Sequence, residues 1–204
     1  METTLQHSKT LHLYRALGLE LFSKNGYHNT SLDELCAELT MTKHSFIECF
    51  ESKEDFFISI VQNIILQRTL NMLIEPSAFV QNPFPLVLEK LEVELEEAIE
   101  SESNTGFLLA NFISEFNTTN KRVNRHLLEI LKIWEVNLVA LLRKGQLDGF
   151  VKREVDCSGV ANHIISSYMG IRTLMVQGNK RELGDQFLWQ MRYYFFSISN
   201  TYTA

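Results

Sequence analysis

A short polar stretch in the first quarter of the chain combines two hydroxyls, an ammonium group and an imidazole: Thr42, Lys43, His44 and Ser45. Such groups donate hydrogen bonds to phosphate oxygens and to the edges of nucleic-acid bases. Lys53 adds a second cation at a point where another helix is expected to begin. Backbone N–H groups at a helix N-terminus also bind phosphate. These residue types therefore predict contacts with a polyanion.

Helix-capping signals place this polar stretch at the beginning of a short helix. Ser31 and Glu34 have the spacing of a capping box, which predicts a helix that begins directly after Ser31. Thr42 is suited to cap a second short helix, and Ser52 with Asp55 a third. Helices of about eight residues are unstable alone and persist when they pack on a neighbour. We therefore expect a helix-turn-helix, whose last short helix presents its N-terminal residues to the major groove of DNA.

The remaining chain follows the 3.6-residue apolar period of amphipathic helices. All three prolines, Pro76, Pro83 and Pro85, fall in one stretch, which we expect to form a boundary because a helix interior does not accept them. The sequence predicts an all-α protein, with an N-terminal tri-helical helix-turn-helix domain and a C-terminal helical bundle. The later helices are predicted at about 86–101, 105–117, 122–145, 157–178 and 182–199.

One stretch resembles the DNA-binding domain of the TetR (tetracycline-repressor) family: LELFSKNGYHNTSLDELCAELTMTKHSFIECFESKEDFF. The similarity lies in the segment from Ala16 to Ser31, in the Thr42-Lys43 pair, and in the segment from Phe50 to Glu54. Members of this family are all-helical, ligand-responsive repressors that pair through their last two helices. The resemblance implies a DNA-binding domain at residues 1–55 and a ligand-binding and dimerisation domain at residues 56–204.

The same resemblance implies which side chains meet DNA and ligand. Each cavity residue alone is better explained by ordinary packing, but as a set they suit a mostly apolar pocket with a few polar anchors. The implied partners are a pseudo-palindromic double-stranded operator, an unknown small-molecule effector and a second copy of the chain. The implied DNA-contacting residues are Thr30, Ser31, Thr42, Lys43, His44, Ser45, Ile47, Glu48 and Lys53. The implied cavity residues are Phe107, Asn111, Trp134, Asn137, His163, Tyr168 and Arg172.

The last two predicted helices carry more apolar side chains than a small bundle is expected to bury alone. Wide apolar faces on terminal helices are typical of an interface, and a dimer sets two recognition helices about one DNA turn apart. We therefore expect a homodimer through these helices. The apolar side chains concerned are Ile164, Ile165, Tyr168, Ile171, Met175, Phe187, Leu188, Met191, Tyr194, Phe195 and Ile198.

Two departures from the family pattern affect DNA binding. Thr40 replaces the usual glycine of the turn, which is tolerable if the backbone there avoids positive φ. Residues 1–60 contain five lysines and arginines against nine acids, a net −4. Because cations supply most non-specific affinity, we expect specific binding that is sensitive to salt. The alternative is a helical interaction protein whose degenerate helix-turn-helix no longer binds DNA.

Composition and charge exclude several other classes of function. The net charge of −6 gives no global basic field, although it permits a local DNA-binding face. Three cysteines without metal-ligand spacing predict neither a disulfide framework nor a metal site. The sequence offers no nucleophile–base pair, so we expect a non-enzyme without a cofactor. The N-terminus lacks the apolar run of a signal peptide and no stretch is long enough to span a membrane, so we expect a cytoplasmic protein.

Overall fold

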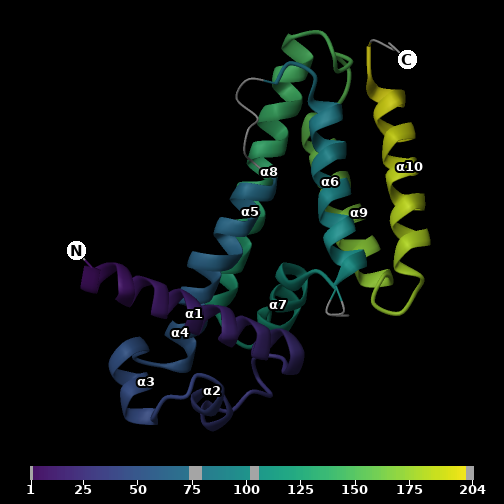
Figure 1. Cartoon of the computed structure of the whole chain (residues 1–204). Helices are drawn as coiled ribbons and strands as arrows, with labels where there is room; N and C mark the ends of the chain where they lie inside the picture. Colours follow the sequence, from purple (N-terminus) through teal and green to yellow (C-terminus); the bar gives the residue numbers. More distant parts are fainter. Residues whose placement is uncertain (1, 74–79, 102–105, 201–204) are drawn as a thin grey trace. The chain divides into compact units, whose positions relative to one another are not determined.

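The computed structural model of the protein describes residues 2–73, 80–101 and 106–200, and most of them are helical (Figure 1). Among these residues, extended backbone pairs at a single isolated bridge, between Val151 and Ser199. The predicted all-α fold is confirmed. The chain forms two compact units: residues 1–68 with 108–129, and residues 69–107 with 130–204.

The first unit contains the helix-turn-helix together with a helical hairpin from the middle of the chain. The caps predicted at Ser31, Thr42 and Ser52 are all present, and the side chain of each accepts a hydrogen bond from a first-turn backbone N–H. The unit consists of α1 (Glu2–Asn25), α2 (Leu32–Glu38), α3 (Lys43–Phe50), α4 (Lys53–Ile60), the π-helix η1 (Val61–Ile65), α7 (Leu108–Phe116) and the beginning of α8 (Lys121–Leu147).

Packing of α1 on α4 depends on a small residue at the contact. A Cβ atom at Gly18 would lie 2.4 Å from a ring carbon of Phe56, closer than real Cβ contacts come. The missing side chain lets Phe56 fill the centre of the unit, where Phe22 and Phe46 also lie buried. The short helices α2 and α3 therefore persist because they close over an aromatic core.

The turn between α2 and α3 has a backbone conformation that is costly for residues other than glycine. Thr40 has a φ of 51°, so the condition under which the loss of glycine would be tolerable here, a backbone without positive φ, is not met. A β-branched residue is rare in this region because its Cβ crowds the backbone. Glu51, which ends α3, has a φ of 63° as well. The helix-turn-helix thus carries local strain on both sides of α3.

We expect Thr40→Gly to raise the free energy of unfolding by about 1 kcal/mol, because glycine adopts this φ without a steric penalty. Chemical denaturation followed by far-UV circular dichroism measures the difference. Ala37→Gly is the matched control: Ala37 is exposed in α2, where glycine should lower stability by about 0.5–1 kcal/mol. A destabilising Thr40→Gly would show that the turn is not strained.

The second unit is a bundle whose first helix begins earlier than predicted. Asn82 caps α6, and Pro83 and Pro85 lie in its first turn rather than before it. A first turn accepts proline because its N–H groups have no intrahelical acceptor. Pro76 lies outside the described residues. The unit contains α6 (Pro83–Glu100), most of α8, α9 (Cys157–Leu174) and α10 (Lys180–Ile198), with the end of α5 (Leu66–Leu73).

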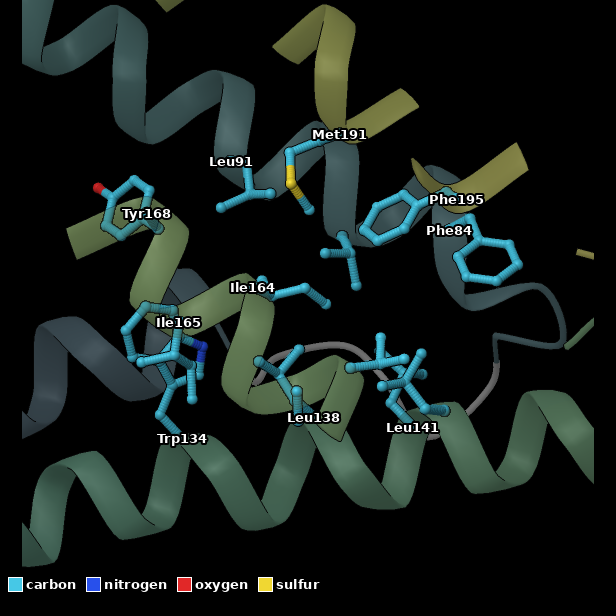
Figure 2. Close-up of a cluster of buried hydrophobic side chains, with 14 of the residues drawn as sticks. Phe84, Leu91, Trp134, Leu138, Leu141, Ile164, Ile165, Tyr168, Met191 and Phe195 are labelled. Carbon is cyan, nitrogen blue, oxygen red and sulfur yellow. The ribbon is translucent and has the colours of Figure 1, made fainter. Parts of the chain in front are cut away.

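Facing side chains of α6, α8, α9 and α10 form the core of this bundle (Figure 2). Phe84 of α6 stacks on Phe195 of α10 with ring centroids 5.0 Å apart. A Cβ at Gly145 of α8 would lie 2.7 Å from the ring of Pro83, so glycine permits this close crossing. None of the described helices combines the length and apolarity needed to cross a membrane.

Candidate DNA-binding face and effector cavity

The N-terminal end of α3 presents an exposed polar face. The Thr42 hydroxyl accepts a hydrogen bond from the Ser45 backbone N–H at 3.1 Å, which fixes the first turn of α3. Lys43, His44, Ile47 and Glu48 are exposed beyond it, and Ser45 is half-buried. Ser31 is exposed at the start of α2, in a capping box with Glu34. Six of the nine predicted DNA-contacting residues therefore share one short, rigid element.

Both basic side chains of this face have acidic partners. The Lys43 ammonium lies 2.6 Å from the Asp33 carboxylate, and this hydrogen-bonded pair raises the lysine pKa. His44 Nε2 lies 3.3 Å from Glu48 one turn further along α3, and its side chain is 85% exposed. Exposed pairs of this kind contribute little and are readily exchanged. Contact with a phosphate therefore requires Lys43 to leave Asp33, and the lost ion pair lowers the net free energy gained on DNA binding.

Two of the predicted DNA contacts point into the unit instead. Thr30 is fully buried, and its hydroxyl donates to the Gly26 carbonyl oxygen at 2.7 Å. The Lys53 ammonium donates to the carbonyl oxygens of Tyr27 at 2.8 Å and Thr30 at 2.6 Å, and lies 4.1 Å from the Tyr27 ring centroid. Burial lowers the pKa of Lys53. In this conformation the Thr30 side chain closes the α1–α2 turn on itself, the Lys53 side chain joins that turn to α4, and neither reaches outward to a phosphate.

The α7–α8 hairpin is attached to the helix-turn-helix by charged and polar groups that the sequence analysis did not identify. Arg122 donates to Glu54 at 2.9 Å and to Asp55 at 2.6 Å. Asn120 caps α8 and donates to the other oxygen of Glu54 at 2.6 Å. Hydrogen bonds from Ser52 and Arg122 hold the pKa of Asp55 below its usual value. These contacts fix the hairpin against the first turn of α4.

Aromatic rings complete the attachment beneath these polar contacts. Phe116 of α7 is fully buried, with its ring centroid 4.7 Å from Tyr27 and 5.0 Å from Phe57. Burial, followed by nearby acids, raises the pKa of Tyr27 to about 12. The backbone N–H of His28 donates to Glu115 at 2.8 Å. The hairpin is thus part of the aromatic core on which the recognition helix is built.

In the second unit, four of the seven predicted cavity residues lie together. The rings of Phe107, Trp134 and Tyr168 meet edge to face, with centroids 5.2 to 6.0 Å apart. Arg172 donates to the Tyr168 hydroxyl at 2.7 Å and to the Gly106 carbonyl at 2.9 Å. Burial raises the pKa of Tyr168. This cluster combines an apolar wall with a cation held in place by fixed acceptors.

The other three predicted cavity residues lie elsewhere. Asn111 is exposed on α7 in the first unit. The side-chain amide of Asn137 donates to the Ile133 carbonyl at 2.8 Å, within its own helix. His163 is exposed, and its ring lies 4.6 Å from Tyr194 of α10. The second unit therefore does not bring these three to the aromatic cluster.

A small cavity adjoins this cluster between α6, α8 and α9. Its volume is about 20 Å³, enough for about one water molecule. Trp134 belongs both to its wall and to the aromatic cluster, so the two features share this side chain. Figure 2 shows Trp134, Leu138 and Leu141 of α8 directed toward Ile164 of α9. The full lining is Leu86, Val87, Lys90, Leu91, Trp134, Leu138, Leu141 and Ile164.

The exposed apolar surface of α10 differs from the one expected. Phe187, Leu188, Met191 and Phe195, expected at an interface, are buried within the second unit. Instead, a row of stacked rings covers the opposite face of α10, at positions i, i+4 and i+7. A helix that is apolar on two faces was the sequence signal for this row. Its members are Trp189, Tyr193 and Phe196, which are 61%, 64% and 45% exposed.

Comparisons with known proteins agree with this architecture. Residues 16–60 match the family described as "Bacterial regulatory proteins, tetR family", and residues 88–187 match "Tetracyclin repressor-like, C-terminal domain". The HTH-type transcriptional repressor DhaR of Mycobacterium sp. (strain GP1) is 29% identical over 178 residues, which are 84% of each chain.

Two solved structures illustrate the similarity of fold. A TetR transcriptional regulator from Chloroflexus aurantiacus J-10-FL has a TM-score of 0.81 at 19% identity, over 97% of this chain and 99% of that one. FadR from Bacillus subtilis, solved in complex with stearoyl-CoA, has a TM-score of 0.67 at 19% identity, over 87% and 95% of the two chains. At these identities the likeness concerns the fold alone.

Proposed function

The chain belongs to the TetR family of DNA-binding transcriptional regulators, and we propose that it is a homodimeric repressor whose operator binding responds to a small-molecule effector. Residues 1–55 would supply the operator contacts, and residues 56–204 the effector site and the dimer contacts. The α7–α8 hairpin would support the DNA-binding part, because it packs on the same aromatic core.

The exposed N-terminal face of α3 is the observation that carries this proposal. Thr42 and Ser45 fix its first turn, while Lys43 and His44 project into solvent, where they are able to meet phosphates and base edges. Ile47 supplies an apolar group suited to a thymine methyl. Since Lys53 faces inward, Lys43 is the main cation of this face, and we infer that its phosphate contact dominates the salt dependence of binding.

The dimer is proposed on the apolar row of α10 and the neighbouring face of α9. Trp189, Tyr193 and Phe196 are exposed side by side, which is unusual for a surface that meets only water. On α9, Gly170 has open space beyond its Cα, so a second helix is able to approach closely there. A two-fold pair would present two α3 helices to a pseudo-palindromic operator.

The effector site is proposed at the cavity between α6, α8 and α9. Effector binding is a property of the family, and the FadR structure contains stearoyl-CoA. The cavity adjoins a cation and aromatic rings, which suits a small molecule with an apolar body. Because its present volume is about 20 Å³, binding would select or produce a wider conformation. That change would shift the equilibrium between DNA-competent and DNA-incompetent forms.

Fluorescence anisotropy with labelled fragments of the DNA upstream of its own gene tests the function. We expect saturable binding at low salt, and Lys43→Met should weaken it about tenfold and reduce the slope of log K against log salt by about 1. Asp33→Asn is the matched variant of opposite sign, because it frees Lys43 and removes an acid. It should strengthen binding. If no upstream fragment binds at low salt, the helix-turn-helix is an interaction scaffold instead.

A further inference from the structure

One cation lies in the otherwise apolar wall of the cavity between α6, α8 and α9. Among its described lining residues, Lys90 is charged and all the others are apolar. Lys90 and Leu86, one turn apart on α6, are half-buried, whereas Leu91, Trp134 and Ile164 are buried. Leu86 and Lys90 are the two lining residues that are not buried, so we place the open side of the cavity along them. A molecule that enters there meets the ammonium group first and the apolar side chains beyond it.

The ammonium group of Lys90 takes part in none of the ion pairs found among the described residues, whereas Glu92 and Glu96 of the same helix are paired. Glu92 pairs with Arg192, and Glu96 pairs with Arg181, both across the contact with α10. These arginines reduce the negative field of α6. An unpaired cation at the mouth of an apolar cavity favours a ligand that brings an anionic group.

Beside the cavity, Arg172, the Tyr168 hydroxyl and the Gly106 carbonyl are already engaged with one another. Arg172 donates to the Tyr168 hydroxyl at 2.7 Å and to the Gly106 carbonyl, while Tyr168 lies 3.4 Å from Glu94. An organic cation seated here would have to displace Arg172, whose guanidinium lies about 6 Å from the ring centroids of Phe107 and Tyr168. The inner end of the cavity therefore favours an uncharged, apolar group.

From this arrangement we propose that the effector is a monoanionic organic molecule, a carboxylate on a compact hydrocarbon body, and that Lys90 binds its charge at the cavity mouth. The hydrocarbon part lies between Leu91, Trp134 and Ile164, and Trp134 moves to widen the cavity. This inference rests on the proposed function, since it names the chemistry of the molecule that regulates operator binding.

Isothermal titration calorimetry of the full chain with hexanoate, hexan-1-ol and hexylammonium tests the charge preference at constant hydrocarbon length. Hexanoate should bind about 10- to 100-fold more tightly than hexan-1-ol, the range expected for one charge-assisted hydrogen bond. Hexylammonium should bind most weakly. Lys90→Met, which keeps about the length of the side chain, should reduce the affinity for hexanoate to the affinity for hexan-1-ol. Lys132→Met removes an exposed lysine of α8 that pairs with Glu135, and should leave the affinities for all three probes unchanged.

The inference is overturned if hexylammonium binds as tightly as hexanoate, if Lys90→Met keeps the preference, or if no probe binds at millimolar concentration. Operator binding without any probe is measured in parallel by anisotropy. A chain that binds its operator but shows any of these results remains a regulator with a different effector class. A chain that binds hexanoate through Lys90 but binds no DNA supports the ligand class and contradicts the proposed function.

Discussion

Tyr193→Asp should convert the protein from a dimer to a monomer and weaken operator binding by about a hundredfold or more. Tyr193 is 64% exposed and lies between Trp189 and Phe196, with ring centroids 6.1 and 6.4 Å away. A carboxylate in the middle of a closed apolar interface would be desolvated without a partner, and losses at such central aromatic positions reach about 2–4 kcal/mol. A monomer would also contact one half-site at a time, whereas a dimer contacts two half-sites together.

Light scattering at micromolar concentration gives the mass, and anisotropy gives the operator affinity. Val136→Asp is the control, because Val136 is an apolar residue of α8 with 50% exposure and lies outside the proposed interface. It should leave both quantities unchanged. If Tyr193→Asp stays dimeric while Val136→Asp dissociates, the chain pairs through α8 and the assignment to α10 is wrong.

Local chemistry explains why the helix starts were predictable. The serine or threonine at Ser31, Thr42 and Ser52 caps its own helix through a contact within three residues, and such a contact is visible in the order of the residues. The same signal at Asn120 went unused, although its side chain caps α8. Short-range hydrogen bonding therefore accounts for the predicted starts of α2, α3 and α4.

Long-range contacts explain what sequence reasoning missed. Lys53 was predicted at a phosphate because it opens α4, but the carbonyl oxygens of Tyr27 and Thr30, which attract it inward, lie more than twenty positions earlier. Arg122 pairs with Glu54 across an even larger separation. A charged side chain at the surface can adopt several orientations that differ little in free energy. Their direction is decided by the packing of helices that no local pattern describes.

The residue Thr40 shows a third kind of difference. Glycine is usual at this turn in the family pattern, and threonine is tolerable there only if the backbone avoids positive φ. The structure keeps the left-handed conformation, with a φ of 51°, despite the β-branched side chain. The reason is that Leu39 and Phe46 are both fully buried on either side of the turn. Their combined burial outweighs a strain of about 1–3 kcal/mol at one residue.

The hairpin that supports the DNA-binding part leads to the second large effect. Phe116→Ala should increase hydrogen exchange of the α2 and α3 amides by about a hundredfold or more. Phe116 is fully buried against Tyr27, His28 and Phe57, and loss of such a ring costs about 3–5 kcal/mol. Local opening of the unit should become easier by a similar amount. Operator affinity should fall in parallel, since α3 is ordered by the same core.

Two comparison variants decide what kind of contact holds the hairpin. Arg122→Ala removes the pairs with Glu54 and Asp55, but Arg122 is 54% exposed. We therefore expect the free energy of local opening to fall by less than about 1 kcal/mol, and hydrogen exchange in α2 and α3 to become less than about fivefold faster. Phe84→Ala removes a buried ring from the second unit and should leave exchange in α2 and α3 unchanged. If Arg122→Ala has the larger effect, ion pairs rather than aromatic packing join the hairpin to the recognition helix. If Phe116→Ala leaves exchange unchanged, the helix-turn-helix is stable without the hairpin, and an effector signal must reach α3 through α4 instead.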